Sequence, residues 1–214
     1  MRKILLPFFA CVCGSLTAYA AVGDTFKSND ITYKVMSETA VEVSDVPTTI
    51  TEAIAIPQAV QDADAKSYTV VGIGEYAFHY TKTPGVTLPP TVTYISSMGF
   101  YNCELASIEL PAALTTIGRY AFGYTKISSI DIPEGVEVLG NSAFYNCSNL
   151  VSVKLPSSLR IIEGSCFYKA PFTSIELPEG LETIERAVFM SSKLESVTLP
   201  STLRTIGEGA FYQT

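Results

Sequence analysis

The sequence predicts a β-rich solenoid, a right-handed coil of 22- or 23-residue repeats that is closed at its N-terminal end by a β cap. The first observation is a recurring dipeptide of a mostly small residue and phenylalanine. Its phenylalanines are separated by 22, 22, 22, 23, 22 and 22 residues and are Phe78, Phe100, Phe122, Phe144, Phe167, Phe189 and Phe211. A second column, an apolar residue followed by proline, keeps the same spacing at Leu88-Pro89, Leu110-Pro111, Ile132-Pro133, Leu155-Pro156, Leu177-Pro178 and Leu199-Pro200. Two columns in a fixed phase indicate stacked structural repeats.

The residues between these columns give each repeat two apolar walls. In one unit, Leu181 and Ile184 form the first wall, and the phenylalanine fills the middle of the coil. The second wall is a strand with the spacing of Leu105, Ile108 and Leu110, whose last two residues point inward with a period of two. One repeat cannot bury its own apolar face, so its stability comes from stacking on its neighbours. Six full repeats, each about 4.8 Å high, predict a rod section about 30 Å long.

The solenoid is predicted over residues 70–214, with about six full repeats and a partial one, and a cap over residues 21–69. Within the cap, two segments alternate like the strands of a hairpin, a third looks like a degenerate first repeat and a fourth reads as a polar loop: residues 31–35, 40–43, 54–57 and 58–67. Solenoids need atypical end units to cover an otherwise open edge. The last residue falls inside a repeat, so we expect either further chain or a partner at that end.

Residues 1–20 are predicted to be a secretory signal peptide. Arg2 and Lys3 supply a positive start, residues 4–16 are apolar, and Ala18-Tyr19-Ala20 places small residues at the two positions that a signal peptidase reads. The alternative is a retained membrane anchor, but the apolar run is shorter than the roughly 20 residues that span a bilayer. We therefore expect an exported protein, secreted or at the cell surface, with no membrane insertion after cleavage.

The composition excludes several classes of function. The 14 Lys and Arg residues are outnumbered by 21 Asp and Glu residues, which gives a formal net charge of −7. This balance argues against nucleic acid, which demands a basic face, and against electrostatic binding to anionic lipid. The single histidine, His79, argues against histidine-based catalysis and multi-histidine metal sites. With no phosphate-binding loop in the sequence, we predict no enzyme activity, no cofactor and no metal.

Three cysteines remain after the predicted cleavage, namely Cys103, Cys147 and Cys166. The first two occupy the same repeat position two units apart, so roughly 9.6 Å separates them, beyond the ~7 Å limit for a disulfide. The cysteine spacing matches no zinc site. We therefore predict that these cysteines are small buried side chains.

The repeat resembles a known family. Its motif, Leu-Pro-x-x-Leu-x-x-Ile-Gly-x-x-Ala-Phe-x-x-Cys/Thr-x-Leu-x-x-Ile, is similar to that of the BspA-like leucine-rich repeat proteins and recurs over residues 70–214. The sequence lacks the asparagine ladder of other leucine-rich repeats, and the corner position after each phenylalanine holds Thr81, Cys103, Thr125, Cys147, Ala170, Ser192 and Thr214. The resemblance implies a leucine-rich repeat coil, a secreted or surface location, and adhesion to host matrix proteins or to other cells.

The strand of each repeat has two outward rows, which alternation places on the same face. One row holds Gly85, Ser107, Ser129, Ser152, Ser174 and Ser196, and the other holds Thr87, Glu109, Asp131, Lys154, Glu176 and Thr198. Because leucine-rich repeats generally bind through this face, the residues from Ser107 to Thr198 are the predicted protein-binding site. Glu109 and Asp131, about 5 Å apart, also match the carboxyl spacing of a retaining glycosidase, but an open face offers no pocket that desolvates one acid.

An aromatic row follows the phenylalanine column, with His79, Tyr101, Gly123, Tyr145, Tyr168, Met190 and Tyr212 in one position and Tyr80 and Tyr124 one step on. The rings either pack against neighbouring turns or form an amphipathic strip that binds sugar rings or a protein. The candidate glycan-binding residues are Tyr101, Tyr145, Tyr168 and Tyr212. A further row alternates in charge at Glu137, Arg160, Glu182 and Arg204, and it predicts opposite-charge pairs worth about 0.2–1 kcal/mol each.

These observations favour a secreted or cell-surface repeat protein that binds macromolecules, namely host extracellular or cell-surface proteins or glycans, through the exposed strand face. A rigid solenoid presents such a surface with little loss of entropy on binding. Two alternatives stay open. One is a passive structural spacer of the envelope, and the other is a glycan-binding module that uses the tyrosine row.

Overall fold

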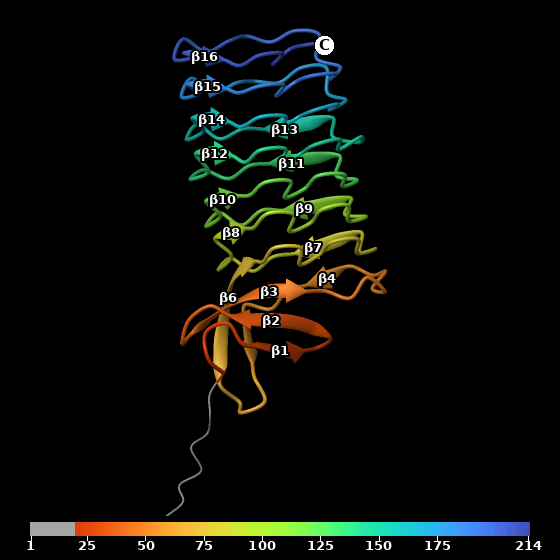
Figure 1. Ribbon diagram of the computed structural model, residues 1–214, viewed down its shortest axis with the longest axis vertical. Helices are drawn as coiled ribbons and strands as arrows, with labels where there is room; N and C mark the ends of the chain where they lie inside the picture. The colour runs from red at the N-terminus through yellow and green to blue at the C-terminus, as the bar shows by residue number, and fades with distance from the viewer. Residues whose placement is uncertain (1–19) are drawn as a thin grey trace, which may run out of the picture.

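The computed structural model describes residues 20–214, which form a stack of coils with a sheet-rich segment at one end (Figure 1). The predicted signal peptide lies outside the described residues, apart from Ala20. All the regular elements of residues 20–214 are β-strands. In this part of the chain there is no helix of the length and apolar character needed to cross a membrane. The predicted β-rich solenoid with a spacing of 22 to 23 residues is confirmed.

The phenylalanine column forms the centre of the stack. From Phe78 to Phe211, successive ring centroids are 4.6 to 5.8 Å apart, and neighbouring ring planes lie within 27° of parallel. The first six rings are fully buried, and Phe211 in the last coil is half-buried. Because each aromatic ring buries a large apolar area, the column supplies a continuous core that no single coil could form.

One wall of the stack is a continuous parallel sheet of short strands. After the longer β6 (Ser67–Ile73), it runs through β8 (Tyr94–Ile95), β10 (Thr116–Ile117), β12 (Val138–Leu139), β14 (Ile161–Ile162), β15 (Thr183–Ile184) and β16 (Thr205–Ile206). The second residue of each short strand points into the core, and these residues are buried from Ile95 to Ile184. Leu181 and Ile184 are both fully buried, as the repeat pattern predicted.

The other wall, which we call the strand face, carries the predicted strands but not one continuous ladder. One sheet contains β4 (Ile54–Ala55), β7 (Gly85–Thr87) and β9 (Ser107–Glu109), and a second contains β11 (Ser129–Asp131) and β13 (Ser152–Lys154). Further along, a single bridge joins Ser174 to Ser196. The strands stay short because a proline, which lacks an N–H, follows two residues later, as Pro111 follows Glu109. The pairing of β4 with β7 places the predicted degenerate repeat on this wall.

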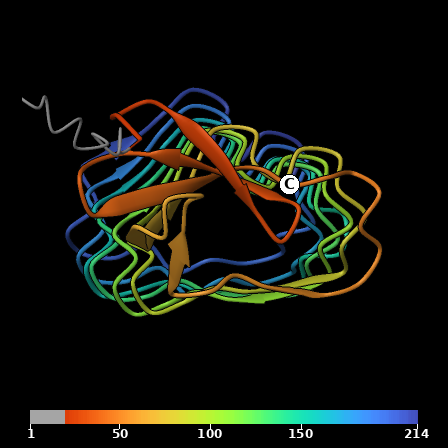
Figure 2. The same cartoon turned by 90° about the horizontal axis from the view of Figure 1, so that it is seen from below.

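The cap covers the first coil with a mixed sheet. Its strands are β1 (Thr25–Ser28), β2 (Ile31–Val35), β3 (Ala40–Asp45) and β5 (Ala59–Gln61). β1, β2 and β3 pair antiparallel in order, β3 runs parallel to β6, and β5 pairs antiparallel with β6. The view from below shows the cap strands lying across the end of the coil (Figure 2).

Two features of the cap differ from the sequence analysis. The prediction of a polar loop over residues 58–67 was wrong for its first half, because β5 lies there and Val60 is buried against β6. The strand β1 was not anticipated. Its turn into β2 has φ values of 48° at Asn29 and 65° at Asp30, the left-handed pair of a type I′ hairpin turn.

A partly buried hydrogen bond ties the cap to the solenoid. The hydroxyl of Tyr94 in β8 donates to the Oε2 atom of Glu42 in β3 at 2.9 Å, and Glu42 is only 8% exposed. Burial and the Glu42 carboxylate raise the pKa of Tyr94, so the hydroxyl keeps its proton for this bond. The Tyr94 ring lies directly over Gly72, and a Cβ atom added to Gly72 would collide with the ring.

We expect Gly72→Ala to lower the free energy of unfolding by about 1–3 kcal/mol, because the new methyl group displaces Tyr94 and breaks its bond to Glu42. Urea unfolding followed by circular dichroism measures the change. The matched control makes the same substitution in a Tyr94→Ala background, where no ring remains to collide. An equal cost in both backgrounds would contradict this explanation.

Each coil contains two non-helical turns, and one residue of each turn has a left-handed backbone conformation. In the coil of Phe122, the left-handed residues are Tyr120, with φ of 52°, and Tyr124, with φ of 62°. Side chains other than glycine avoid this region, and a β-branched side chain is least compatible with it. No Val, Ile or Thr occupies either position in the coils from Phe78 to Phe211. Every coil has such a pair of left-handed residues. The pair is therefore a feature of the repeat and does not mark a functional site.

Two glutamate side chains, Glu134 and Glu179, tie neighbouring coils together at the turns after Pro133 and Pro178. The Glu134 carboxylate accepts hydrogen bonds from the backbone N–H and the hydroxyl of Ser157, at 3.1 and 3.0 Å. The Glu179 carboxylate accepts the equivalent pair from Ser201, at 3.0 and 2.8 Å. The donors from Ser157 lower the pKa of Glu134. These bonds fix the register of exposed turns.

The prediction of ion pairs in the row from Glu137 to Arg204 was wrong. Within residues 70–214, the ion pair closer than 4.0 Å joins Arg186 and Glu208, at 3.9 Å, and both side chains are exposed. Neighbouring residues of the predicted row are joined through their backbones instead, since the Arg160 N–H donates to the Glu137 carbonyl at 2.8 Å. The Arg160 guanidinium lies close to Gly180, in the space that a Cβ atom on that residue would occupy.

Candidate functional site

The strand face presents straight rows of polar side chains. Parallel pairing aligns Thr87 with Glu109 between β7 and β9, and Asp131 with Lys154 between β11 and β13. The predicted protein-binding residues are all exposed, namely Ser107, Glu109, Ser129, Asp131, Ser152, Lys154, Ser174, Glu176, Ser196 and Thr198. The intervening side chains point into the core, so the exposed rows rest on a packed layer.

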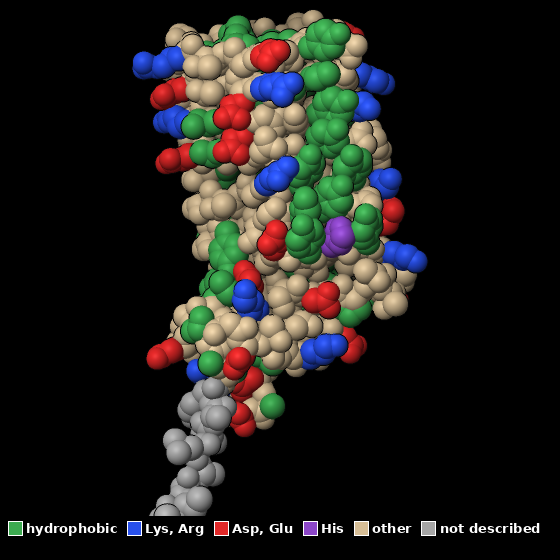
Figure 3. Space-filling model, viewed as in Figure 1, with side chains coloured by type: hydrophobic (Ala, Val, Ile, Leu, Met, Phe, Trp, Pro, Cys, Tyr) green, Lys and Arg blue, Asp and Glu red, His purple; other side chains and the backbone are tan. Residues whose placement is uncertain are grey.

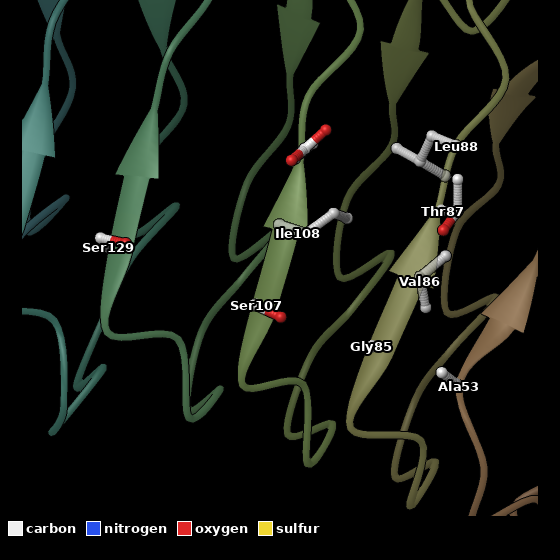
Figure 4. A pocket seen from close by; sticks show the side chains of 9 residues that line it. Ala53, Gly85, Val86, Thr87, Leu88, Ser107, Ile108 and Ser129 are labelled. Carbon is white, nitrogen blue, oxygen red and sulfur yellow. The ribbon is translucent and has the colours of Figure 1, made fainter.

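The strand face is hollowed beside the cap (Figure 4). A depression of about 590 Å³ lies over β7 and β9, and Gly85, Ser107 and Glu109 are among its lining residues. Gly85 occupies a position where five other coils have serine, and the neighbouring Ala53 carries only a methyl group, so little side chain fills this place. Sequence analysis missed Ala53 because it lies 32 residues before Gly85, outside the spacing of 22.

The two acidic residues considered for glycoside hydrolysis are Glu109 and Asp131. They lie on successive coils, but their strands, β9 and β11, belong to different ladders. Both side chains are exposed. A glycosidase needs one carboxyl group in a desolvated environment that raises its pKa. The exposed pair gives no support to this chemistry, and it forms an acidic patch on the strand face.

A second exposed feature is a column of aromatic side chains, seen as a green band in the space-filling view (Figure 3). We define the tyrosine strip by its continuous ring contacts, through Tyr76, His79, Tyr80, Tyr101, Tyr120, Tyr124, Tyr145 and Tyr168. Its neighbouring centroids are 4.0 to 6.5 Å apart. The rings pack on one another and are also open to solvent, with Tyr80 53% exposed.

Two ring geometries divide the strip. Tyr101 meets Tyr80, Tyr120 and Tyr124 nearly edge-on, with interplanar angles of 79°, 83° and 72°. Tyr145 and Tyr168 instead stack with centroids 4.6 Å apart and planes 15° from parallel. When two rings stack, each covers a face of the other. When one ring points its edge at a second ring, the faces of the first ring stay free of that contact. The half of the strip around Tyr101 also holds its two most exposed rings, Tyr76 at 46% and Tyr80 at 53%, and is the better platform for a flat ligand.

The predicted glycan-binding residues divide between the strip and the coil beyond it. Tyr101, Tyr145 and Tyr168 belong to the strip. Tyr212 is exposed, but Met190 occupies the coil between, and no ring contact within residues 20–214 joins Tyr212 to the strip.

Sequence analysis missed two tyrosines and two cations of the strip. Tyr76 and Tyr120 precede their phenylalanines by two residues, and their left-handed backbone was not foreseen from the spacing. The Arg119 guanidinium lies 5.2 Å from the centroid of the Tyr120 ring, and the Lys169 ammonium lies 5.2 Å from that of Tyr168. Both are cation–π contacts, which place positive charge directly on the strip.

His79 belongs to the strip and has aromatic neighbours. Its ring centroid lies 4.0 Å from that of Tyr80 and 5.6 Å from that of Tyr101, and burial lowers its pKa. Residues 20–214 contain no group of three or more His, Cys, Asp or Glu side chains arranged to hold a metal ion.

The corner row contains two buried pairs of a thiol and a hydroxyl. Cys103 and Cys147 are free thiols, and the Sγ atom of Cys103 lies 2.9 Å from the Oγ1 atom of Thr81. In the next such pair, the Sγ atom of Cys147 lies 3.4 Å from the Oγ1 atom of Thr125. Cys166 is also free and fully buried, so the prediction of small buried side chains is confirmed.

We expect the buried thiols to be inert in the folded protein and to limit its stability at high pH. Burial raises the pKa of Cys147 to about 11, whereas an unfolded thiol ionises near pH 8.5. The stabilisation is therefore complete below about pH 8.5 and falls as the pH rises towards 11, by about 3 kcal/mol for Cys147. Denaturant titrations between pH 8 and 10.5 measure this fall.

The matched control for the thiol prediction is Cys147→Ala, for which the free energy of unfolding should fall less steeply with pH. A thiol reagent at pH 8 should label the native protein only after urea is added. Rapid labelling of native Cys147, or an unchanged slope in Cys147→Ala, would contradict the burial argument.

Comparison with known families agrees with the geometry of the coils. The model of the BspA-type leucine-rich repeat region matches residues 71–170 and 115–214, with six copies of the repeat. The chain belongs to this family. Leucine-rich repeat proteins are generally binding or scaffold modules and not enzymes. Among curated proteins, none matches the sequence.

Solved structures of bacterial leucine-rich repeat proteins resemble the BspA-type chain over most of its length. The T. pallidum leucine-rich repeat protein is 26% identical, with a TM-score of 0.77 over 89% of each chain. A leucine-rich repeat protein from Bacteroides ovatus is 29% identical, with a TM-score of 0.66 over 88% of this chain and 56% of its own.

The pneumococcal vaccine antigen PcpA shares the fold at 21% identity, with a TM-score of 0.73 over 86% of this chain and 51% of its own. The BspA-type chain thus spans about half the length of the pneumococcal and Bacteroides proteins.

Proposed function

We propose that this BspA-type protein is exported to the cell surface or secreted, and that it binds a macromolecular partner through its strand face without catalysing a reaction. The observation that carries the proposal is the alignment of exposed Ser, Thr and acidic side chains in straight rows, as Thr87 with Glu109 and Ser129 with Ser152. Such rows give a long, polar and regular surface. The N-terminal segment and the family membership support export.

Rigidity favours binding at this surface. The exposed rows are held by backbone ladders over a stacked phenylalanine core, so few side chains and no loop need to be ordered when a partner docks. The depression beside the cap adds a place where a protruding side chain of the partner can enter. Because the strand face extends over several coils, contacts add along its length.

The partner class proposed is an extracellular or cell-surface protein of a host or of another cell. The mixed but mainly acidic row, with Glu109, Asp131 and Glu176 around Lys154, suits a partner with a basic patch. Electrostatic attraction of this kind weakens with salt, since the Debye length falls from about 10 Å at 0.1 M to about 3 Å at 1 M.

The experiment is a binding panel with the purified chain against immobilised fibronectin, fibrinogen, laminin and mucins at two salt concentrations. The proposal expects at least one protein to bind, with lower affinity at the higher salt concentration. Circular dichroism confirms that the chain is folded in each assay. A folded chain that binds none of the proteins would overturn adhesion to host matrix and favour a structural spacer.

A further inference from the structure

One edge of the tyrosine strip is rich in positive charge on an otherwise acidic protein. In the coils from Phe78 to Phe167, this edge carries three cations against one acid, namely Lys82, Lys126 and Lys169 against Glu104, and the opposite edge holds Arg119 with Glu75 and Glu163. Arg119 and Lys169 contact its rings directly. Figure 3 shows blue side chains on both sides of the green band. The strand face carries Glu109, Asp131 and Glu176 against Lys154, so the basic edge of the strip differs from it in sign.

The strip is long and narrow. It runs along the stack from the coil of Phe78 to that of Phe167, in steps set by phenylalanine centroids 4.6 to 5.5 Å apart. One coil contributes between one and three of its rings, so its width is that of a few side chains. A globular protein partner typically covers about 800 Å² per side in a broad patch. A track of this shape matches an extended polymer better.

We infer that the tyrosine strip binds a linear anionic polysaccharide, which lies along the solenoid axis with its acidic groups on the bordering cations. Sugar rings pack on the aromatic faces left open around Tyr101, and carboxylate or sulfate groups accept hydrogen bonds from tyrosine hydroxyls and from Lys and Arg side chains. The coils set a regular step along the strip, and successive coils offer the polymer between one and three rings each. This site is separate from the strand face and does not depend on the proposed protein partner.

The protonated tyrosine hydroxyls of the strip are suited to bind an anion. Burial, with neighbouring tyrosines, raises the pKa of Tyr101 and of Tyr145, so their hydroxyls remain donors well above neutral pH. A tyrosine hydroxyl that keeps its proton can donate to an acidic oxygen without charge repulsion.

The test uses two matched pairs of polymers with the purified chain. Dextran sulfate is compared with neutral dextran, and polygalacturonate with its fully methyl-esterified form, by isothermal titration calorimetry at two salt concentrations. The inference expects binding of at least one acidic polymer, weaker at higher salt, and no binding of the neutral polymer of the same backbone. Equal binding of a matched pair, or no binding of either acidic polymer, would overturn it.

Variants locate the site on the strip. Tyr80→Ala with Tyr101→Ala should weaken the acidic polymer about tenfold or more, and so should Lys82→Glu with Lys126→Glu. Because removing rings can disturb packing, Tyr101→Phe with Tyr124→Phe keeps the rings and deletes only the hydroxyl donors, and it should also reduce affinity. Unchanged affinity in all three folded variants would overturn the assignment. It would also be overturned if the strip variants alone abolished the binding of a panel protein.

Discussion

Phe122→Ala is expected to lower the free energy of unfolding by about 3–5 kcal/mol, the largest effect on stability in the solenoid. The Phe122 ring is fully buried and lies between Phe100 and Phe144, with centroids 5.4 and 5.3 Å away and planes within 5° of parallel. Truncation removes both stacking contacts and leaves a cavity between two coils. Because each coil is stabilised only by its neighbours, the loss also weakens the coupling between the two halves of the stack. Urea unfolding measures the change.

The matched control is Phe211→Ala in the last coil. Phe211 is half-buried and stacks on one side only, with Phe189 at 5.3 Å. We expect a loss of less than half that of Phe122→Ala, since about half of the contacts are removed and the site opens to solvent. Equal losses at the two positions, or a loss below about 1 kcal/mol for Phe122→Ala, would contradict a core built on the stacked column.

Charge reversal on the strand face, with Glu109→Lys and Asp131→Lys together, is expected to weaken binding of a panel protein by about 100-fold. Like charges placed against a basic partner cost several kcal/mol, and each 1.4 kcal/mol is a factor of ten in affinity. Both side chains are exposed, so the fold should tolerate the changes with little effect on unfolding. Biolayer interferometry against the immobilised partner measures the affinity.

A control of equal charge change separates local contact from overall charge. Glu137→Lys with Glu182→Lys changes the net charge by the same amount, on exposed positions beside the wall of β12 and β15. We expect at most a severalfold loss from this control. A similar loss in both double variants would show that net charge, and not the strand face, governs binding. Glu109→Gln with Asp131→Asn should give an intermediate effect.

The repeat pattern predicted the layout of the solenoid because its cause is local and periodic. The phenylalanine spacing located the central column, and the positions of Leu181 and Ile184 located one wall, since apolar side chains at a fixed phase can be buried only by stacking. The outward rows of the strand face followed from alternation. The family resemblance rested on the same residues and was confirmed over residues 71–214.

Features that depend on three-dimensional contacts did not follow from the pattern. The ladder between β9 and β11 is missing although their sequences fit the repeat, and the Arg160 side chain turns to Gly180 instead of to an acidic neighbour. Tyr120 joins the tyrosine strip from a left-handed position that spacing alone does not reveal. Side-chain direction and hydrogen-bond geometry decide such features, and a one-dimensional pattern contains neither.

The measurement that tests the central claim most directly is one binding experiment on three proteins: the unaltered chain, Glu109→Lys with Asp131→Lys, and Tyr80→Ala with Tyr101→Ala. Each is titrated against the panel protein that binds best and against the better acidic polysaccharide. We expect the strand-face variant to lose the protein and keep the polysaccharide, and the strip variant to do the reverse. Retention of the protein ligand by the folded strand-face variant would contradict the claim that this BspA-type chain binds through its strand face.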